Sequence, residues 1–397
     1  MSEADRFFAC PYCRVRSCID QKGYFRFLFA ASESIPENAE IIYIPYWRFK
    51  GTLFYGTLEN GVANNYLDIS RIALAAGVDC LPGSLGVRSQ ALPLKLVCAE
   101  SRGRFLKPVR LKTAMHEFDR MNRYLRLKDD IVFKEYIGET ASLIYSPVYV
   151  QNNRLYDGIL NEPFRLSLPE NIDFREMDAC RPERETVFIA GLCPSCGWDL
   201  DGDAQSLTLV CRNCQSLWRP RRGQLVRVRF GCVESDNPQA TWLPFWRMET
   251  DISGAPLASF ADLIRLGNLP RVVQPDWENI PFYFWSPAFK VRGDIFHRLC
   301  LQLAYTQPKA DLVETIGRRR IRPITLPASE GLESIKITLA AIMRPAETWL
   351  PRFSEINISP QRVTLVFLPF DERPQDFFSP DTGISINRNI LIHAANL

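Results

Sequence analysis

Histidine is scarce in this chain, with only His116, His297 and His393 among 397 residues. This scarcity argues against histidine catalysis and against metal sites with mixed cysteine and histidine ligands. Charge of one sign is not in large excess either: 48 lysines and arginines face 45 aspartates and glutamates, a net charge of +3. No global field therefore draws the protein to nucleic acid or to a membrane. No run reaches the roughly 18 apolar residues of a membrane span.

Export and catalytic signals are also missing. The first ten residues, MSEADRFFAC, lack the basic segment and apolar stretch of a signal peptide. We therefore expect a cytoplasmic protein in a reducing compartment, whose twelve cysteines are thiols and metal ligands rather than disulfides. The sequence contains no glycine-rich phosphate loop, no G-x-S-x-G elbow and no HExxH helix. Acidic residues are scattered, so no paired-carboxylate site is predicted.

The composition is that of a soluble globular protein, and its strand and helix patterns predict an α+β fold. Apolar residues make up 46% and charged residues 23%, and the length suggests two or three domains. The 28 prolines and 12% aromatic residues favour short strands and turns. Because proline lacks a backbone donor, strands such as IIYIPYWRF and VTLVFLPF are expected at sheet edges or bends. Apolar periodicity predicts packed helices over 111–127, 256–266 and 329–343.

The two halves of the chain show five matching patterns in the same order. The pairs are Cys10-Pro-Tyr-Cys13 with Cys193-Pro-Ser-Cys196, 44–49 with 243–248, 66–72 with 260–266, 85–92 with 289–296, and 143–149 with 365–370. The preserved order indicates an internal duplication of a β-rich domain. The alternative is that proline-aromatic strands recur because one fold class favours them.

A charged segment without apolar periodicity lies in the middle of the chain, which predicts a linker there. The predicted organisation is a first β-rich repeat domain over 1–175, with a partial cysteine knuckle at its N-terminus. A linker over 176–190 follows, then a zinc ribbon over 191–220, and then a second β-rich repeat domain over 221–397.

Cys193, Cys196, Cys211 and Cys214 have the spacing of a four-thiolate metal site. Two C-x-x-C knuckles are separated by 14 residues of turn and strand character. Four sulfurs form the tetrahedral set that Zn²⁺ prefers and leave no open position for water, which indicates a structural site. The segment from about 190 to 220 resembles the zinc ribbons, a resemblance that implies bound Zn²⁺ and says little about function. The alternatives are rubredoxin-like iron, which Gln215 in place of glycine makes less favourable, and unliganded thiols.

Cys10, Cys13 and Cys18 form a less complete set, since no second C-x-x-C follows at ribbon distance. One interpretation is a decayed ribbon that folds without metal. The second is another metal site, completed by Cys80, Cys98, Cys180 or His116. The third is an iron–sulfur cluster.

Two arginine groups follow the knuckles in sequence and offer a possible anion or nucleic-acid contact. They are Arg219, Arg221 and Arg222 beside Trp218, and Arg318, Arg319 and Arg320. Such groups can hold phosphates while the indole stacks on a base. The alternative is that they line solvated strand faces. The matched residues Arg48 and Arg247, Arg88 and Arg292, and Asp68 and Asp262 predict either internal ion pairs or an anion pocket.

These observations favour a non-enzymatic structural or adaptor protein that acts through protein–protein contacts, including strand addition at exposed sheet edges. The first alternative is a nucleic-acid-binding zinc-ribbon protein. The second is a redox or iron–sulfur protein that uses the N-terminal cysteines.

Overall fold

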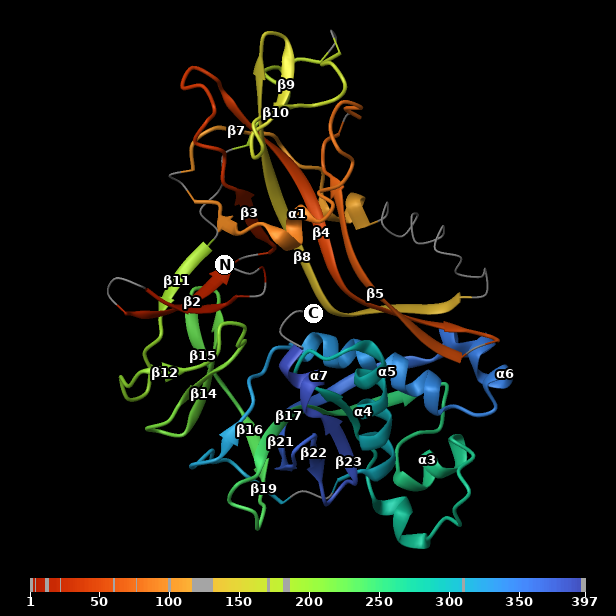
Figure 1. The fold of residues 1–397 in the computed structure, drawn as a ribbon. Coiled ribbons are helices and arrows are strands. Elements are labelled where there is room, and N and C mark those ends of the chain that lie inside the picture. The colour runs from red at the N-terminus through yellow and green to blue at the C-terminus, as the bar shows by residue number, and fades with distance from the viewer. Residues whose placement is uncertain are drawn as a thin grey trace.

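The structure is a computed structural model, which describes residues 3, 5–10, 14–21, 23–59, 61–75, 77–98, 101–115, 131–169, 172–180, 186–308 and 311–393. It is rich in β-structure, with one large sheet in each half of the chain and helices gathered in the second half (Figure 1). Within these residues no helix is long and apolar enough to cross a membrane.

The sheet of the first half is built on two long antiparallel strands, β4 (Ile41–Thr57) and β8 (Ile131–Gln151). Its main order is β6-β3-β8-β4-β5, with β3 parallel to β8. The shorter elements are β3 (Phe25–Phe29), β5 (Gly61–Ile72), α1 (Arg88–Ala91), β6 (Leu94–Leu96), β7 (Arg104–Phe105), β9 (Arg154–Asp157) and β10 (Glu162–Pro163).

The sheet of the second half has the order β19-β16-β21-β17-β18, with β16 parallel to β21. Its strands are β16 (Phe230–Val233), β17 (Thr241–Ser253), β18 (Phe284–Pro287), β19 (Leu312–Val313), β20 (Arg320–Ile321), β21 (Asn357–Glu372), β22 (Asp376–Ser379) and β23 (Ile384–Asn387). The helical elements are α3 (Phe260–Leu266), η2 (Pro275–Asn279), α4 (Gly293–Thr306), α5 (Ala328–Ile342), α6 (Ala346–Trp349), η3 (Leu350–Glu355) and α7 (Arg388–His393).

The central strand pairs of the two sheets have the same register. Trp47 lies opposite Leu143, and Trp246 lies opposite Leu365. Each indole N–H donates to a backbone carbonyl in a later loop, of Val109 at 2.8 Å for Trp47 and of Leu326 at 3.0 Å for Trp246. Both tryptophans are buried.

Prolines lie in the central strands β4, β17 and β21, so the prediction of edge strands is wrong for β4 and β21. The Pro45 carbonyl accepts from Ala73 N, and the Pro244 carbonyl accepts from Ala288 N. In both cases the donor is the first residue after the neighbouring strand, which is β5 beside β4 and β18 beside β17. Because a residue in an antiparallel strand directs its N–H and C=O to the same side, the missing donor costs no ladder hydrogen bond.

One proposed match between the halves is wrong, because residues 66–72 belong to strand β5 whereas residues 260–266 form helix α3. Asp68 and Asp262 are therefore not equivalent. Asp68 binds Arg48, whereas the Asp262 carboxylate caps its own helix by accepting from Ser259 N at 2.9 Å. An Asp-x-x-Arg spacing occurs readily in both kinds of element, so the match carried no structural information.

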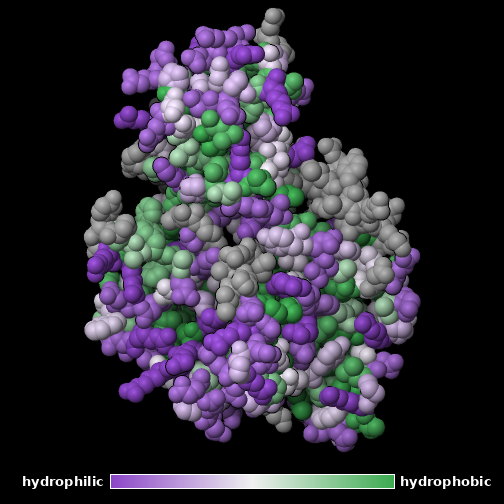
Figure 2. Space-filling view, in the orientation of Figure 1, coloured by the Kyte–Doolittle hydropathy of each residue, from purple (hydrophilic) through white to green (hydrophobic). Residues whose placement is uncertain are grey.

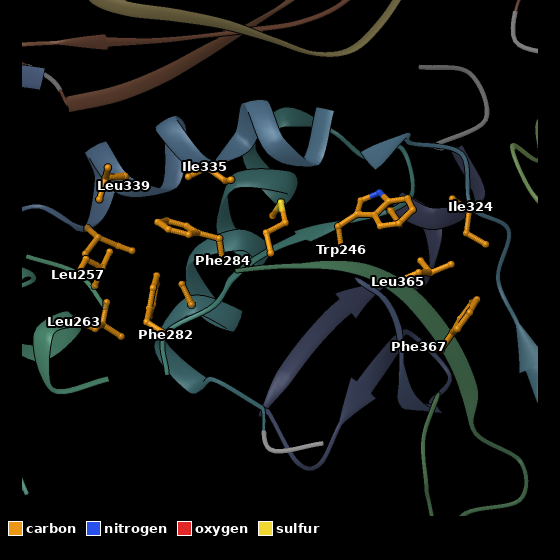
Figure 3. Packing of buried hydrophobic residues seen from close by; sticks show 14 of the residues in the cluster. Trp246, Leu257, Leu263, Phe282, Phe284, Ile324, Ile335, Leu339, Leu365 and Phe367 are labelled. Atoms are coloured by element: carbon orange, nitrogen blue, oxygen red, sulfur yellow. The ribbon is translucent and has the colours of Figure 1, made fainter. Parts of the chain in front are cut away.

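The helix predicted over 329–343 is confirmed as α5, and the one over 256–266 is the shorter α3. Ile335 and Leu339 of α5 point toward the sheet side that carries Trp246 and Phe284 (Figure 3). Of the helix predicted over 111–127, residues 111–115 are described and are helical, and the rest lies outside the described residues. The predicted linker 176–190 ends in a strand, β11 (Thr186–Ala190), because these residues pair with β2 (Arg16–Gln21).

The two halves meet where the C-terminal end of β4 and the N-terminal ends of β5 and β8 lie against α4 and α5 (Figure 1). The rings of Phe54 and Phe296 are 5.9 Å apart there, and Lys336 Nζ lies 2.5 Å from Glu135 Oε1. A Cβ at Gly293 would lie 2.6 Å from Thr52 Cγ2, so glycine permits this close approach. The contact combines apolar packing with the Lys336–Glu135 ion pair.

Candidate metal centre

The four-cysteine ribbon is a small antiparallel sheet of its own, with the order β12-β13-β14-β15. Its strands are β12 (Leu200–Asp201), β13 (Leu209–Cys211), β14 (Ser216–Arg221) and β15 (Gln224–Val228). The first knuckle precedes β12, and the second forms the turn between β13 and β14. The predicted turn and strand between the two knuckles are therefore confirmed.

Backbone hydrogen bonds hold the first knuckle. Cys193 N donates to Trp198 O at 2.8 Å, and Gly197 N donates to Cys193 O at 2.8 Å. Gly197 has a φ of 72°, the left-handed conformation that glycine adopts without strain. Gln215 takes the same place in the second knuckle with a φ of 59°. Its side chain binds Arg212 O at 2.6 Å and Gly317 N at 2.6 Å, which offsets the strain of a non-glycine residue there.

The four sulfurs lie within 4.8 Å of one another. The Cys193 and Cys214 sulfurs are 3.5 Å apart, and those of Cys196 and Cys211 are 3.4 Å apart. A tetrahedral zinc site with Zn–S bonds of about 2.3 Å has sulfurs about 3.8 Å apart. The cluster can therefore hold a metal ion after small adjustments. The sequence prediction that these four cysteines converge is confirmed.

The environments of the thiols differ. Hydrogen bonds from the Asn213 side chain and from the Trp198 backbone lower the pKa of Cys196 to about 6. Burial raises the pKa of Cys211 to about 12. A buried thiol of this kind ionises when a bound cation compensates the charge, so metal binding and deprotonation are coupled. Sequence reasoning missed Ser216, whose Oγ lies 2.9 Å from Cys214 Sγ, because a serine two residues after a knuckle has no distinctive spacing.

The ribbon is attached to both halves of the chain. On one side Arg6 N and Phe7 N donate to Ala204 O at 2.6 and 3.0 Å, and Arg16 Nη1 lies 2.7 Å from Asp201 Oδ1. On the other side Leu207 N donates to Ile324 O at 2.8 Å. In Figure 1 the ribbon lies below the N-terminal strands and beside the second sheet. The metal cluster thus lies in the segment that joins the two halves.

Cys10 and Cys18 belong to a hairpin of β1 (Phe7–Ala9) and β2, which β11 extends to three strands. Cys10 N donates to Val15 O, and Arg14 N, at a φ of 58°, donates to Cys10 O. These bonds repeat the pattern of the first ribbon knuckle. Cys18 is buried, which raises the pKa of its thiol to about 12.

Cys13 and His116 lie outside the described residues. Among the described residues, Cys10 and Cys18 belong to no group of three or more metal ligands. Of the other candidates, Cys80 is buried in the first-half core, Cys98 is exposed, and the Cys180 sulfur lies 3.6 Å from the Tyr145 hydroxyl.

The candidate nucleic-acid contacts are mostly exposed: Arg219, Arg221 and Arg222 at the end of β14, and Arg318 and Arg320. Trp218 is buried, and its indole donates to Ser216 Oγ at 2.7 Å, so it offers no platform for a base. Arg318 and Arg319 line a surface cavity that also contains Glu234, Asp236, Asp371 and Asp381. Those carboxylates reduce the attraction of this cavity for phosphate.

The matched arginines do not form an anion pocket together. Arg48 is buried and binds Asp68 and Glu3, and Arg88 pairs with Asp157. Arg292 pairs with Asp294, and the Arg247 guanidinium lies 5.0 Å from the Tyr283 ring centroid. The predicted ion pairs are present for three of them, with different partners in the two halves.

No protein-family model, no curated protein and no solved structure matches this chain. The fold and the cysteine cluster therefore define the class of the protein, a β-rich α+β protein with a four-cysteine ribbon that can bind a metal ion.

Proposed function

We propose that the four cysteines bind one Zn²⁺ and that the ribbon is a structural element of a non-enzymatic adaptor protein. Four sulfur ligands at near-tetrahedral separations support zinc. A set of four protein ligands leaves no open coordination position, which supports a structural rather than a catalytic role.

We also propose that the chain arose by internal duplication. The shared strand order and the equivalent indole hydrogen bonds of Trp47 and Trp246 support this origin. The β1–β2 hairpin extends the similarity to the ribbon, because Ala9 pairs with Arg16 as Leu192 pairs with Asp199 around the two knuckles.

The adaptor proposal rests on one observation, an exposed apolar surface beside the first knuckle. We name it the knuckle surface: Val15, Phe188, Leu192 and Trp198, which are 51%, 58%, 50% and 59% exposed. Gly191 N donates to Arg16 O, so Leu192 lies near Val15. Figure 2 has hydrophobic residues at the left of the molecule, where Figure 1 has β11. Apolar side chains grouped in this way favour a protein partner.

The backbone beside this surface is suited to strand addition. In the described residues β11 is an edge strand of the sheet β1-β2-β11. An extended segment of a partner can pair with such an edge while its side chains contact Phe188. Pairing of this kind buries apolar area and satisfies backbone donors and acceptors together.

The test compares affinity capture by the wild-type chain, by Leu192→Ser/Trp198→Ser and by the control Val272→Ser, each with and without nuclease treatment. Val272 is 80% exposed and lies in the loop after α3, away from the ribbon in sequence. A partner captured by the wild type and the control, and lost with the double variant, supports the proposal. Identical capture by all three proteins contradicts the adaptor surface. Loss of all capture on nuclease treatment favours the nucleic-acid alternative.

Elemental analysis of anaerobically purified protein tests the metal. One zinc per chain, lost in Cys211→Ser, is expected. Stoichiometric iron with a visible absorption band at this site would contradict the zinc assignment.

A further inference from the structure

A cavity of about 440 Å³ lies where the ribbon loop meets the second sheet and α7. Its walls come from segments that are distant in sequence, and include Asp203, Leu243, Phe289, Lys290, Arg322 and Leu391. The Leu207–Ile324 backbone hydrogen bond attaches the ribbon loop to the segment that carries Arg322. The volume is within the usual range of small-molecule sites, about 300–1,000 Å³.

Two cations, Lys290 and Arg322, line this cavity. Within the described residues, neither takes part in an ion pair. The Lys290 ammonium lies 3.4 Å from Thr140 Oγ1, and the Arg322 guanidinium lies 5.8 Å from the Phe377 ring centroid. Among the described residues of the lining, Asp203 is the one carboxylate, so the two cations and one anion give these residues a net charge of +1. A monoanion would therefore neutralise the lining.

Burial lowers the pKa of Lys290 to about 8, and the nearby cations Lys50 and Arg6 add to the shift, whereas Glu330 and Glu3 oppose it. The ammonium is thus poorly compensated by its surroundings, since a sufficiently close carboxylate would have kept its pKa high. A bound anion would supply the missing counter-charge. The other side of the cavity is apolar, with Leu243, Phe289 and Leu391.

We propose that this cavity binds a small organic acid, with its carboxylate at Lys290 and Arg322 and its hydrocarbon part against Leu243, Phe289 and Leu391. The site is separate from the cysteine cluster and goes beyond the adaptor function. It uses residues from the ribbon loop and from the second half, so the ligand is expected to stabilise their contact.

The experiment is calorimetric titration of the full zinc-loaded chain with sodium octanoate at pH 7. Octan-1-ol and inorganic phosphate are the comparison ligands. Octanoate is expected to bind more tightly than either, because only octanoate combines the charge with the chain. Lys290→Met and Arg322→Met should each weaken octanoate binding about 10-fold or more, as expected for a hydrogen bond to a charged group. The control Arg271→Met, an exposed arginine outside the cavity lining, should not change it.

A second readout locates the ligand without a variant and so does not depend on variant folding. Reductive methylation at pH 8, analysed by peptide mass spectrometry, should modify Lys290, and octanoate should protect it by covering the amine and raising its pKa. Any of four results would overturn the proposal. Octanoate does not bind, octan-1-ol or phosphate binds equally well, both variants keep the wild-type affinity, or octanoate leaves Lys290 unprotected.

Discussion

Replacing Arg48 by methionine tests whether the buried ion network of the first half stabilises the fold. Arg48 is only 3% exposed. Its guanidinium donates to both Asp68 oxygens at 3.0 Å, to Glu3 Oε2 at 2.5 Å and to Ser89 O at 2.6 Å. Methionine fills much of the volume but leaves two carboxylates in a poorly solvated site.

Removing one partner of a buried ion pair costs about 3–5 kcal/mol. In a unit of roughly 200 residues, each kcal/mol lowers the melting temperature by about 2–4 °C, so a decrease of about 6–20 °C is expected. Differential scanning calorimetry at pH 7 measures it. The matched control is Arg292→Met. Arg292 pairs with Asp294, and their side chains are 65% and 51% exposed, respectively. The control should lose no more than about 1 kcal/mol.

The pH dependence gives a further check. Burial raises the pKa of Asp68, but the hydrogen bonds from Arg48 outweigh it and hold the pKa below its usual value. Burial also raises the pKa of Glu3. The stability that Asp68 contributes is therefore present above the ordinary aspartate pKa and is lost as the pH falls through the lowered one. In Arg48→Met both carboxyls can protonate more easily, so its deficit should shrink in acid. A loss below about 1 kcal/mol at pH 7, or one equal to that of the control, would refute this reasoning.

Four further substitutions test the fold and the cluster. Cys211→Ser should lose the metal. Amide exchange at Phe7, measured by NMR, should then accelerate, because Phe7 N donates to Ala204 O, which belongs to the ribbon. Unchanged exchange would contradict this expectation. Trp47→Phe and Trp246→Phe should each lower the free energy of unfolding in urea by about 1 kcal/mol, since each removes one buried hydrogen bond. A loss of stability in only one of the two variants would contradict the equivalence of the two tryptophans. Asp262→Ala should cost about 1 kcal/mol through its lost helix cap. Burial raises the pKa of Asp262, but hydrogen bonds from backbone N–H groups outweigh burial and hold the pKa below its usual value. The stability deficit of Asp262→Ala should therefore vanish as the pH falls through that lowered pKa. A deficit that persists in acid would exclude the helix cap as its cause.

Local spacing in the sequence was enough to predict the cysteine cluster and two of the helices. A C-x-x-C turn brings two sulfurs together within five residues, and Gly197 supplies its left-handed backbone, so little tertiary information is needed. The periodicity of 329–343 likewise predicted α5 to within a residue at each end, because one face of a helix must be apolar to pack.

Only the tertiary structure decided which distant residues meet. The place of Pro45 in a central strand depends on where the neighbouring strand ends, and no pattern in β4 encodes that end. The equal spacing of Asp68 and Asp262 could not distinguish a strand from a helix, since both elements tolerate it. Lys290 and Arg322 line one cavity because the segment after β18 hydrogen-bonds to the segment before α5, where Thr325 N donates to Ala288 O. Charge compensation in the interior depends on such long-range contacts, and the sequence determines them only through the whole fold.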